Sequence, residues 1–151
     1  MSKRALVCHP IGYVDNEISP GQDVRWEEID SRLVIEEKFS EALEGIEGFS
    51  HLFVIFWLHA KEGEPPLKVH PEQREDMPLV GVLATRAPMR PNPIGLTAVQ
   101  LLKRRGNVLL VKGLDAYHGT PILDLKPYLP RGDSIPEARV PGWIERLWES
   151  L

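Results

Sequence analysis

The stretch HLFVIFWLH, from His51 to His59, most strongly indicates how this chain folds. It is built mainly from β-branched, aromatic and leucine side chains, which suit the pleated surface of a sheet. It is apolar at odd and even positions alike, a pattern typical of a strand buried inside a sheet. We therefore expect a central β-strand here.

The sequence around this strand predicts further short strands joined by turns. The expected strands are Ala5–Val14, broken near Pro10 and Gly12, and Arg32–Glu36, Leu79–Thr85, Leu96–Arg105 and Val108–Leu114. The last two flank an Arg-Gly-Asn sequence, which is a hairpin signal. Neither a βαβ rhythm nor an internal repeat is visible.

Helix signals are few. Ser40 is predicted to cap a short helix over EALEGI, and Pro141 to open an amphipathic helix in PGWIERLWESL. We therefore expect a mostly β fold, a small antiparallel β-barrel with one or two short helices and a C-terminal amphipathic helix. Closure into a barrel is how such sheets remove their edges.

Composition indicates an ordinary globular protein. At 151 residues, with 42% hydrophobic and 26% charged residues, the chain is expected to form a single domain over residues 1–151. Cys8, the only cysteine, lies in the apolar run ALVC and is expected to be a buried thiol. The absence of a second cysteine, of a signal peptide and of a long apolar run indicates a cytoplasmic protein without a membrane span.

The charge distribution leaves nucleic-acid binding open. The net charge of -4 argues mildly against it, because nucleic-acid binders usually carry a basic face. The middle of the chain, however, carries basic residues with few acids nearby, so a local basic surface is compatible with the total. These residues are Arg86, Arg90, Lys103, Arg104, Arg105 and Lys112.

Two stiff, polar segments point to a functional site. In TRAPMRPNPIGLT, Thr85 to Thr97, three prolines exclude a helix and Gly95 allows a close approach of the backbone. This loop should present Arg86, Arg90 and Asn92. The second segment is HGTPILDLKPYLP, His118 to Pro130, which contributes Asp124, Lys126 and Tyr128.

Three blocks of the chain resemble the signature blocks of the TrmO, or TsaA-like, tRNA methyltransferases. They are FSHLFVIFWLHA (Phe49–Ala60), GVLATRAPMRPNPIGLT (Gly81–Thr97) and HGTPILDLKPYLP, in the order and spacing of that family. The resemblance implies a β-barrel methyltransferase that forms a homodimer and uses S-adenosyl-L-methionine. Its implied substrate is tRNA, methylated at N6 of threonylcarbamoyladenosine next to the anticodon.

The resemblance also implies which residues contact the cofactor. Carried over by motif, they are Pro20, Gly21, Gln22, His59, Ala60, Arg86, Leu96, Gly119, Thr120, Pro121 and Ile122. We expect no additional C-terminal domain of the kind that many bacterial members carry. The mode of tRNA binding therefore does not follow from the resemblance.

The residues themselves support part of this assignment. No G-x-G-x-x-G follows a predicted strand, so a cofactor pocket would have to be built from loops. Arg86 could bind a carboxylate as a planar fork, or be an ordinary surface arginine. The Gly119-Thr120-Pro121 turn could reach an adenine through its backbone, or merely reverse the chain.

The acceptor side is expected elsewhere. Asp124, Lys126 and Tyr128 would share one face of an extended strand and are the candidate catalytic residues, with Asp124 or water as the general base. The alternative is a structural ion pair beside an anchoring tyrosine. RNA contacts are expected at Arg90, Asn92, Arg104 and Arg105.

A metal site is not expected. His51 and His59 would lie about 26 Å apart on a straight strand, too far to share an ion. Trp143 and Trp148 favour packing over base stacking. Two other functions stay open: methylation of a different acceptor, and RNA or nucleotide binding without catalysis.

Overall fold

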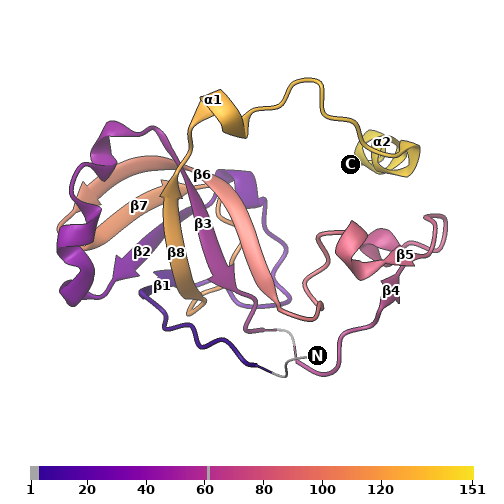
Figure 1. Cartoon of the computed structure of the whole chain (residues 1–151), viewed down its shortest axis with the longest axis horizontal. Coiled ribbons are helices and arrows are strands. Elements are labelled where there is room, and N and C mark those ends of the chain that lie inside the picture. The colour runs from indigo at the N-terminus through magenta and orange to yellow at the C-terminus, as the bar shows by residue number, and fades with distance from the viewer. Residues whose placement is uncertain (1–3, 61) are drawn as a thin grey trace. The chain divides into compact units, whose positions relative to one another are not determined.

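Six antiparallel strands close into a barrel, as the sequence predicts (Figure 1). Their order around the barrel is β1-β2-β7-β6-β3-β8, and β8 pairs with β1. The strands are β1 Gly12–Asp15, β2 Asp30–Ile35, β3 His51–Trp57, β6 Ile94–Arg105, β7 Val108–Lys112 and β8 Pro121–Pro127. Short 3-10 helices accompany them: η1 Trp26–Glu28, η2 Glu37–Leu43 and η3 Ile46–Gly48.

The computed structural model describes residues 4–60 and 62–151, which fall into two compact units. The first, Met1–Lys61 with Pro93–Tyr128, contains the barrel. The second, Glu62–Asn92 with Leu129–Leu151, contains the strand pair β4 Lys68–Val69 and β5 Val80–Gly81, the 3-10 helices η4 Pro71–Gln73 and η5 Val82–Ala84, and the helices α1 Pro130–Asp133 and α2 Gly142–Glu149. Within this unit, the Arg74 guanidinium donates to Ser150 Oγ at 2.5 Å and to Asp76 Oδ2 at 2.6 Å.

The predicted central strand is confirmed. β3 pairs with β6 from His51, opposite Gln100, to Trp57, opposite Ile94. On its other side it pairs with β8, with a bulge between Ile55 and Phe56. Its even-numbered residues are buried inside the barrel, and its odd-numbered ones lie on the outer face.

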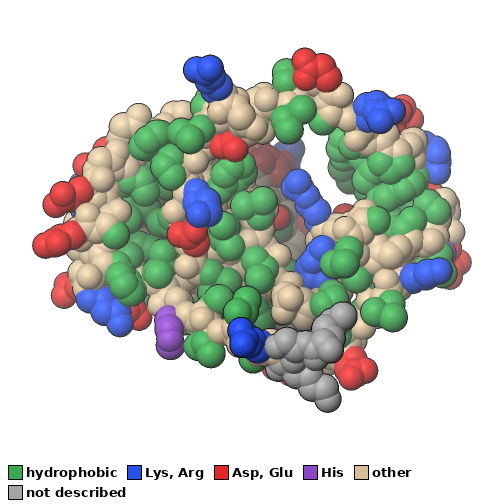
Figure 2. Space-filling view, viewed as in Figure 1, with side chains coloured by type: hydrophobic (Ala, Val, Ile, Leu, Met, Phe, Trp, Pro, Cys, Tyr) green, Lys and Arg blue, Asp and Glu red, His purple; other side chains and the backbone are tan. Residues whose placement is uncertain are grey.

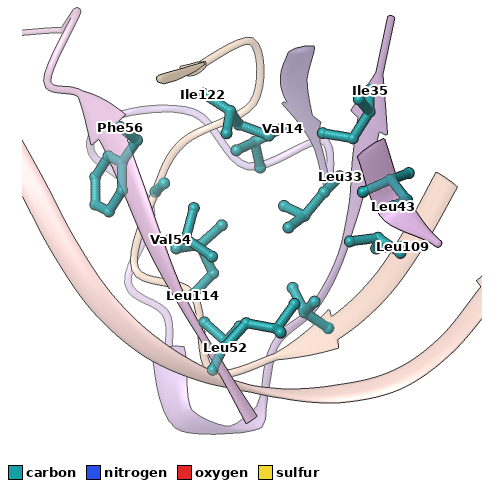
Figure 3. Packing of buried hydrophobic residues seen from close by; sticks show 13 residues of the cluster. Val14, Leu33, Ile35, Leu43, Leu52, Val54, Phe56, Leu109, Leu114 and Ile122 are labelled. Carbon is teal, nitrogen blue, oxygen red and sulfur yellow. The ribbon is translucent and has the colours of Figure 1, made fainter. Parts of the chain in front are cut away.

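The core fills the barrel interior with aliphatic side chains from every barrel strand (Figure 3). Two positions in the barrel require glycine, because a neighbouring group lies where the Cβ of any other residue would be. A Cβ on Gly95 would lie 2.5 Å from the ring of Phe56, and one on Gly12 would lie 2.2 Å from the carbonyl oxygen of Val34. The close approach expected at Gly95 is therefore confirmed.

The expected N-terminal strand is wrong over most of its length. The strand begins at Gly12, not Ala5, and Pro10 has no N–H to offer a ladder. Leu6 and Val7 are 93% and 78% exposed, whereas Ile11, directly before β1, packs against the core. Cys8 lies in the same segment and is exposed, so the prediction of a buried thiol is wrong as well.

Two further local predictions are corrected. The strand expected over Leu79–Thr85 shortens to Val80–Gly81, because the Thr85 N–H donates to Val82 O at 3.1 Å and closes a 3-10 turn. Ser40 does not cap a helix, since it lies inside η2, whose N-cap is Glu36. The hairpin of β6 and β7 and the C-terminal helix α2 are confirmed.

Candidate functional site

The loop that follows β1 and the turn that precedes β8 meet at one end of the barrel. The Gly119 N–H donates to Val14 O at 2.8 Å, and the Val14 N–H donates to Thr120 O at 3.0 Å. One step further, the His118 N–H donates to Ile18 O at 2.8 Å. These bonds tie the loop Asp15–Gln22 to the turn that contains the predicted Gly119 and Thr120.

Residues 19–22 form a tight turn within this loop. Gly21 has a φ of 92°, a left-handed conformation that favours glycine. The Gln22 N–H donates to Ser19 O at 3.3 Å, and the Gln22 side-chain oxygen accepts from the Ser19 N–H at 2.5 Å. The predicted contacts Pro20, Gly21 and Gln22 are therefore exposed on a turn with a defined shape.

His59 and Thr120 belong to different predicted blocks and meet through their side chains. Thr120 Oγ1 lies 3.2 Å from His59 Nδ1, across 61 positions of sequence, and 2.7 Å from Tyr117 O. The carbonyl can only accept, so the single hydroxyl proton of Thr120 goes to Tyr117. His59 Nδ1 must then be the donor to Thr120, which leaves the lone pair of a neutral His59 on Nε2.

Burial strengthens this assignment. Thr120 is 2% exposed, so its hydroxyl has little access to water as an alternative partner. His59 is exposed and can present Nε2 to a ligand. Ala60 follows it and is also exposed, while Pro121 and Ile122 begin β8, with Ile122 fully buried in the core.

Leu96 and Asp124 flank Ile55 on the outer face of the barrel. The register sets Leu96 of β6 opposite Ile55 of β3, and Ile55 opposite Asp124 of β8. Leu96 is 50% exposed and offers an apolar surface. The predicted cofactor contact and the predicted general base therefore belong to one row of side chains across three strands.

Asp124 and Lys126 form an ion pair, with Lys126 Nζ 3.0 Å from Asp124 Oδ2. The other carboxylate oxygen accepts from the Leu125 N–H at 2.9 Å. Both side chains are largely exposed, so the pair adds little stability. The ion pair fits both predicted alternatives, a structural pair and a catalytic one.

Tyr128 packs beside this pair. Its ring meets the ring of Phe53 edge-on at 5.4 Å between centroids, and that of His51 at 6.4 Å. Its N–H donates to His51 O at 3.0 Å. The three rings extend the outer face of β3 beyond the row of Asp124.

The outer face of β3 and β6 is apolar. Trp57 and Ile94 lie opposite each other in the register and are each about two-fifths exposed, and Leu96 lies two positions further along β6. Figure 2 shows hydrophobic side chains gathered over the barrel strands β3, β6 and β8. We call Trp57, Ile94 and Leu96 the outer apolar patch.

Arg104 is held by its own chain. Its guanidinium donates to Gly106 O at 2.8 Å, Leu43 O at 3.2 Å and Glu47 Oε1 at 3.0 Å. The side chain is only 15% exposed, because it lies against the 3-10 helices η2 and η3, which contain Leu43 and Glu47. Arg105 is exposed. A role for Arg104 in RNA binding therefore stays a prediction that competes with an observed structural role.

The carboxyl of Glu47 has a lowered pKa. A backbone hydrogen bond, and after it the hydrogen bond from Arg104, holds the pKa of the Glu47 carboxyl below its usual value. The Arg104–Glu47 contact is therefore a charge-assisted hydrogen bond at the surface.

Arg86, Arg90 and Asn92 belong to the second unit. Arg90 is half-buried and donates to Thr85 O at 2.9 Å and to Ala87 O at 3.1 Å, so it braces the proline-rich loop. Arg86 and Asn92 are exposed. Within this unit, the loop thus presents one arginine outward and uses the other to keep its own shape.

Asn16 makes three side-chain hydrogen bonds that its place in the sequence does not predict. Its Nδ2 donates to Ser31 Oγ at 3.0 Å and to Ala116 O at 2.8 Å, and its Oδ1 accepts from the Ile18 N–H at 3.0 Å. The contacts of His118 are not predicted by the sequence either, and its Nδ1 accepts from the N–H groups of Asn16 and Glu17 at 3.3 Å. The Asp-Asn pair at the end of a strand was the only local signal.

Two absences can be stated for residues 4–60 and 62–151. They contain no group of three or more His, Cys, Asp and Glu side chains that could hold a metal ion. None of their helices has the length and apolar character needed to cross a bilayer.

The closed antiparallel barrel places the protein among the β-barrel folds, distinct from the doubly wound nucleotide-binding folds. The chain belongs to the family described as the tRNA-methyltransferase O N-terminal domain, whose model matches residues 11–134. The resemblance inferred from the sequence is thereby confirmed.

Individual relatives agree with this membership. A probable S-adenosyl-L-methionine-binding protein of Pyrococcus abyssi is 38% identical over 147 residues, covering 93% of this chain and 78% of the relative. The tRNA (adenine(37)-N6)-methyltransferase of Escherichia coli is 41% identical over 104 residues, covering 66% of this chain and 44% of that enzyme. The crystal structure of TrmO from Pseudomonas aeruginosa matches with a TM-score of 0.71 and 32% identity, covering 90% of this chain and 62% of that one.

Proposed function

We propose that this protein is an S-adenosyl-L-methionine-dependent methyltransferase of tRNA that modifies N6 of adenosine, with N6-threonylcarbamoyladenosine beside the anticodon as its target. The observation that carries the proposal is the hydrogen bond between His59 and Thr120. It joins two segments that family resemblance independently assigns to the cofactor. Relatives named as S-adenosyl-L-methionine-binding proteins support the same ligand.

The described residues fit such a ligand. Within the barrel unit, His59 offers an acceptor at Nε2 and Leu96 offers an exposed apolar surface. Arg86, in the second unit, is proposed as a contact on the family resemblance alone, as a planar cation for a carboxylate. The exposed Gly119 and the half-buried Pro121 leave backbone groups of the turn available to an adenine edge. Bound in such a site, the cofactor would supply an electrophilic methyl group.

Positioning supplies most of the proposed catalysis, because methyl transfer requires alignment of the nucleophile, the methyl group and the sulfur. Methylation would require N6 to lose its proton, and we assign the carboxylate of Asp124 as the group that would accept it. Lys126 holds that carboxylate at 3.0 Å, and Tyr128 packs beside it. If water takes the proton instead, Asp124→Asn should keep most of its turnover rate.

RNA contacts are proposed at Arg90, Asn92, Arg104 and Arg105. Arg105 is the best supported of the barrel residues because its side chain is exposed. Arg104 can contribute through the shape of the β6 end as well as through its charge.

A homodimer is proposed through the outer apolar patch. Within it, Trp57 and Ile94 expose apolar surface that a two-fold pairing would bury. Trp57→Glu should shift the protein toward the monomer in light scattering at micromolar concentration. A wild-type monomer under those conditions would contradict the proposal. The same functional assignment implies a cytoplasmic protein.

Methylation of defined tRNA substrates tests the function. Purified protein and cofactor are incubated with tRNA carrying threonylcarbamoyladenosine or with matched tRNA lacking it, and nucleosides are identified by mass spectrometry. We expect an added methyl group only on the modified nucleoside. Cofactor binding without methylation of either tRNA would favour another acceptor, and RNA binding without cofactor binding would favour a non-catalytic barrel.

Cofactor binding itself is tested by Arg86→Ala. The loss of a charge-assisted pair to the carboxylate should weaken affinity roughly ten- to hundredfold. Wild-type affinity by calorimetry would remove Arg86 from the site.

A further inference from the structure

The loop Asp15–Gln22 carries three predicted cofactor contacts but has little packing of its own. Ile18 is the only one of its residues that is buried, and Pro20, Gly21 and Gln22 are exposed. Glu17 has a φ of 62°, a left-handed conformation that is uncommon for a residue with a side chain. Such a loop needs outside contacts to keep one shape.

Asn16 supplies two of these outside contacts, and a third hydrogen bond within the loop, through one amide group. Its Nδ2 bridges Ser31 Oγ in β2 and Ala116 O in the turn before β8, while its Oδ1 accepts the Ile18 N–H. Ser31 is 1% exposed, so the bridge reaches the barrel interior. One side chain thus fixes the loop to a barrel strand and to the facing turn.

His118 holds the next step of the loop. Its Nδ1 accepts from the N–H groups of Asn16 and Glu17, both at 3.3 Å. Asp15 Oδ1 lies 3.4 Å from the same nitrogen, but Nδ1 cannot carry a proton for Asp15 and also accept two N–H groups. Because Nδ1 accepts from these two N–H groups, we infer that the His118 ring is neutral and carries its proton on Nε2. The other carboxylate oxygen of Asp15, Oδ2, accepts from Arg32 Nε at 3.0 Å.

We propose that Asn16 and His118 are positioning residues that hold the loop Asp15–Gln22 in the shape that binds the cofactor. This inference rests on the proposed function, because Pro20, Gly21 and Gln22 are cofactor contacts only within it. Neither Asn16 nor His118 needs to touch the ligand. They act by tying the loop to the turn at Gly119, so that both sides of the site keep one relative position.

Asn16→Asp is the sharpest variant because it keeps the size of the side chain, replaces its two N–H donors by a carboxylate oxygen and adds one negative charge, as does the control variant below. A carboxylate oxygen would then face the carbonyl of Ala116, and the loop should detach. We expect the dissociation constant of S-adenosylmethionine, measured by calorimetry, to rise about tenfold or more. The KM for tRNA should change little.

Asn107→Asp is the matched control. Asn107 Nδ2 donates to the carbonyl of Ile35, at the far end of β2 from Ser31. This variant also loses an amide-to-carbonyl hydrogen bond in the barrel, and its melting temperature should fall comparably. Its affinity for S-adenosylmethionine should stay within about twofold of wild type, because it does not touch the loop.

A second pair of variants tests His118. His118→Asn keeps an acceptor near the position of Nδ1, whereas His118→Leu removes it. In hydrogen exchange, the amides of Asn16 and Glu17 should lose protection in the leucine variant and keep most of it in the asparagine variant. Cofactor affinity should follow the same order.

The outcomes separate the inference from the proposed function. If the wild type binds S-adenosylmethionine and Asn16→Asp binds it equally well, positioning by Asn16 is refuted and the function stands. Equal weakening in Asn16→Asp and Asn107→Asp also refutes it, because general destabilisation would then explain both. If the wild type does not bind S-adenosylmethionine, the proposed function and the inference fail together.

Discussion

Replacing Arg104 with alanine should destabilise the barrel, although the sequence presents this residue as part of a basic cluster. Its guanidinium is 15% exposed and donates to the carbonyls of Gly106 and Leu43. Hydrogen bonds with one charged partner contribute about 1.5–3 kcal/mol each, so losing the two carbonyl contacts should cost roughly 3 kcal/mol after partial replacement by water. The surface contact with Glu47 is left out of this sum.

Thermal unfolding measures the effect. For a chain of this length, a loss of roughly 3 kcal/mol lowers the melting temperature by about 6–12 °C. Arg105→Ala is the control, because that side chain is exposed and should shift the midpoint by only about 1–2 °C. If Arg104→Ala melts with the wild type, the hydrogen bonds observed here do not stabilise the fold and the reasoning is refuted.

RNA binding separates the two roles of the cluster. Each phosphate contact contributes about 0.7–0.9 to the slope of log affinity against log salt. We expect Arg105→Ala to flatten this slope, and the double variant with Arg104→Ala to flatten it further. A further loss in the double variant, measured below its melting temperature, would show that Arg104 also binds phosphate. Binding insensitive to salt would remove the whole cluster from the RNA surface.

Three further outcomes are expected. Gly95→Ala should lower the free energy of unfolding by about 2 kcal/mol or more, since its methyl group would overlap the aromatic ring beneath it; denaturant unfolding checks this. The hydrogen bond from Arg74 lowers the pKa of the Asp76 carboxyl in the folded protein. The pair therefore stabilises the fold at a pH above the pKa of the unfolded carboxyl, and this stabilisation is lost as the pH falls through the lower pKa of the folded state. Arg74→Ala should lessen the fall in melting temperature that acid causes. Thr120→Val should release His59 from its Nδ1–H tautomer in nitrogen-15 NMR spectra, while Thr120→Ser should retain it.

The strands that could be predicted from sequence are those whose pattern is local. The run from His51 and the hairpin on either side of Gly106 carry their own signals, and both are present. The expected strands at Ala5 and Leu79 failed because strand propensity does not say whether a partner is available. Barrel closure followed from the abundance of strands, but the register that aligns Leu96, Ile55 and Asp124 did not.

The candidate site divides in the same way. Motif resemblance singled out His59 and Thr120, and the structure joins them. Asn16 and His118 escaped notice because their partners lie about a hundred positions away in sequence. For Arg104, sequence shows a charge but not the carbonyl groups that surround it.

The seam between the first and last barrel strands has a consequence for folding. β1 and β8 share only the pairs Gly12–Ile122 and Tyr13–Pro121, and these partners are over a hundred positions apart. Contacts of such separation carry a large loop-closure entropy, so this seam should form late and open first. A ligand that bridges the loop after β1 and the turn before β8 binds only the barrel in which this seam is closed. At a free concentration a hundred times its dissociation constant, such a ligand would add about 2.7 kcal/mol to the free energy of unfolding. The concentration of the cofactor would then determine how often β1 and β8 separate, and therefore how well the protein resists proteolysis.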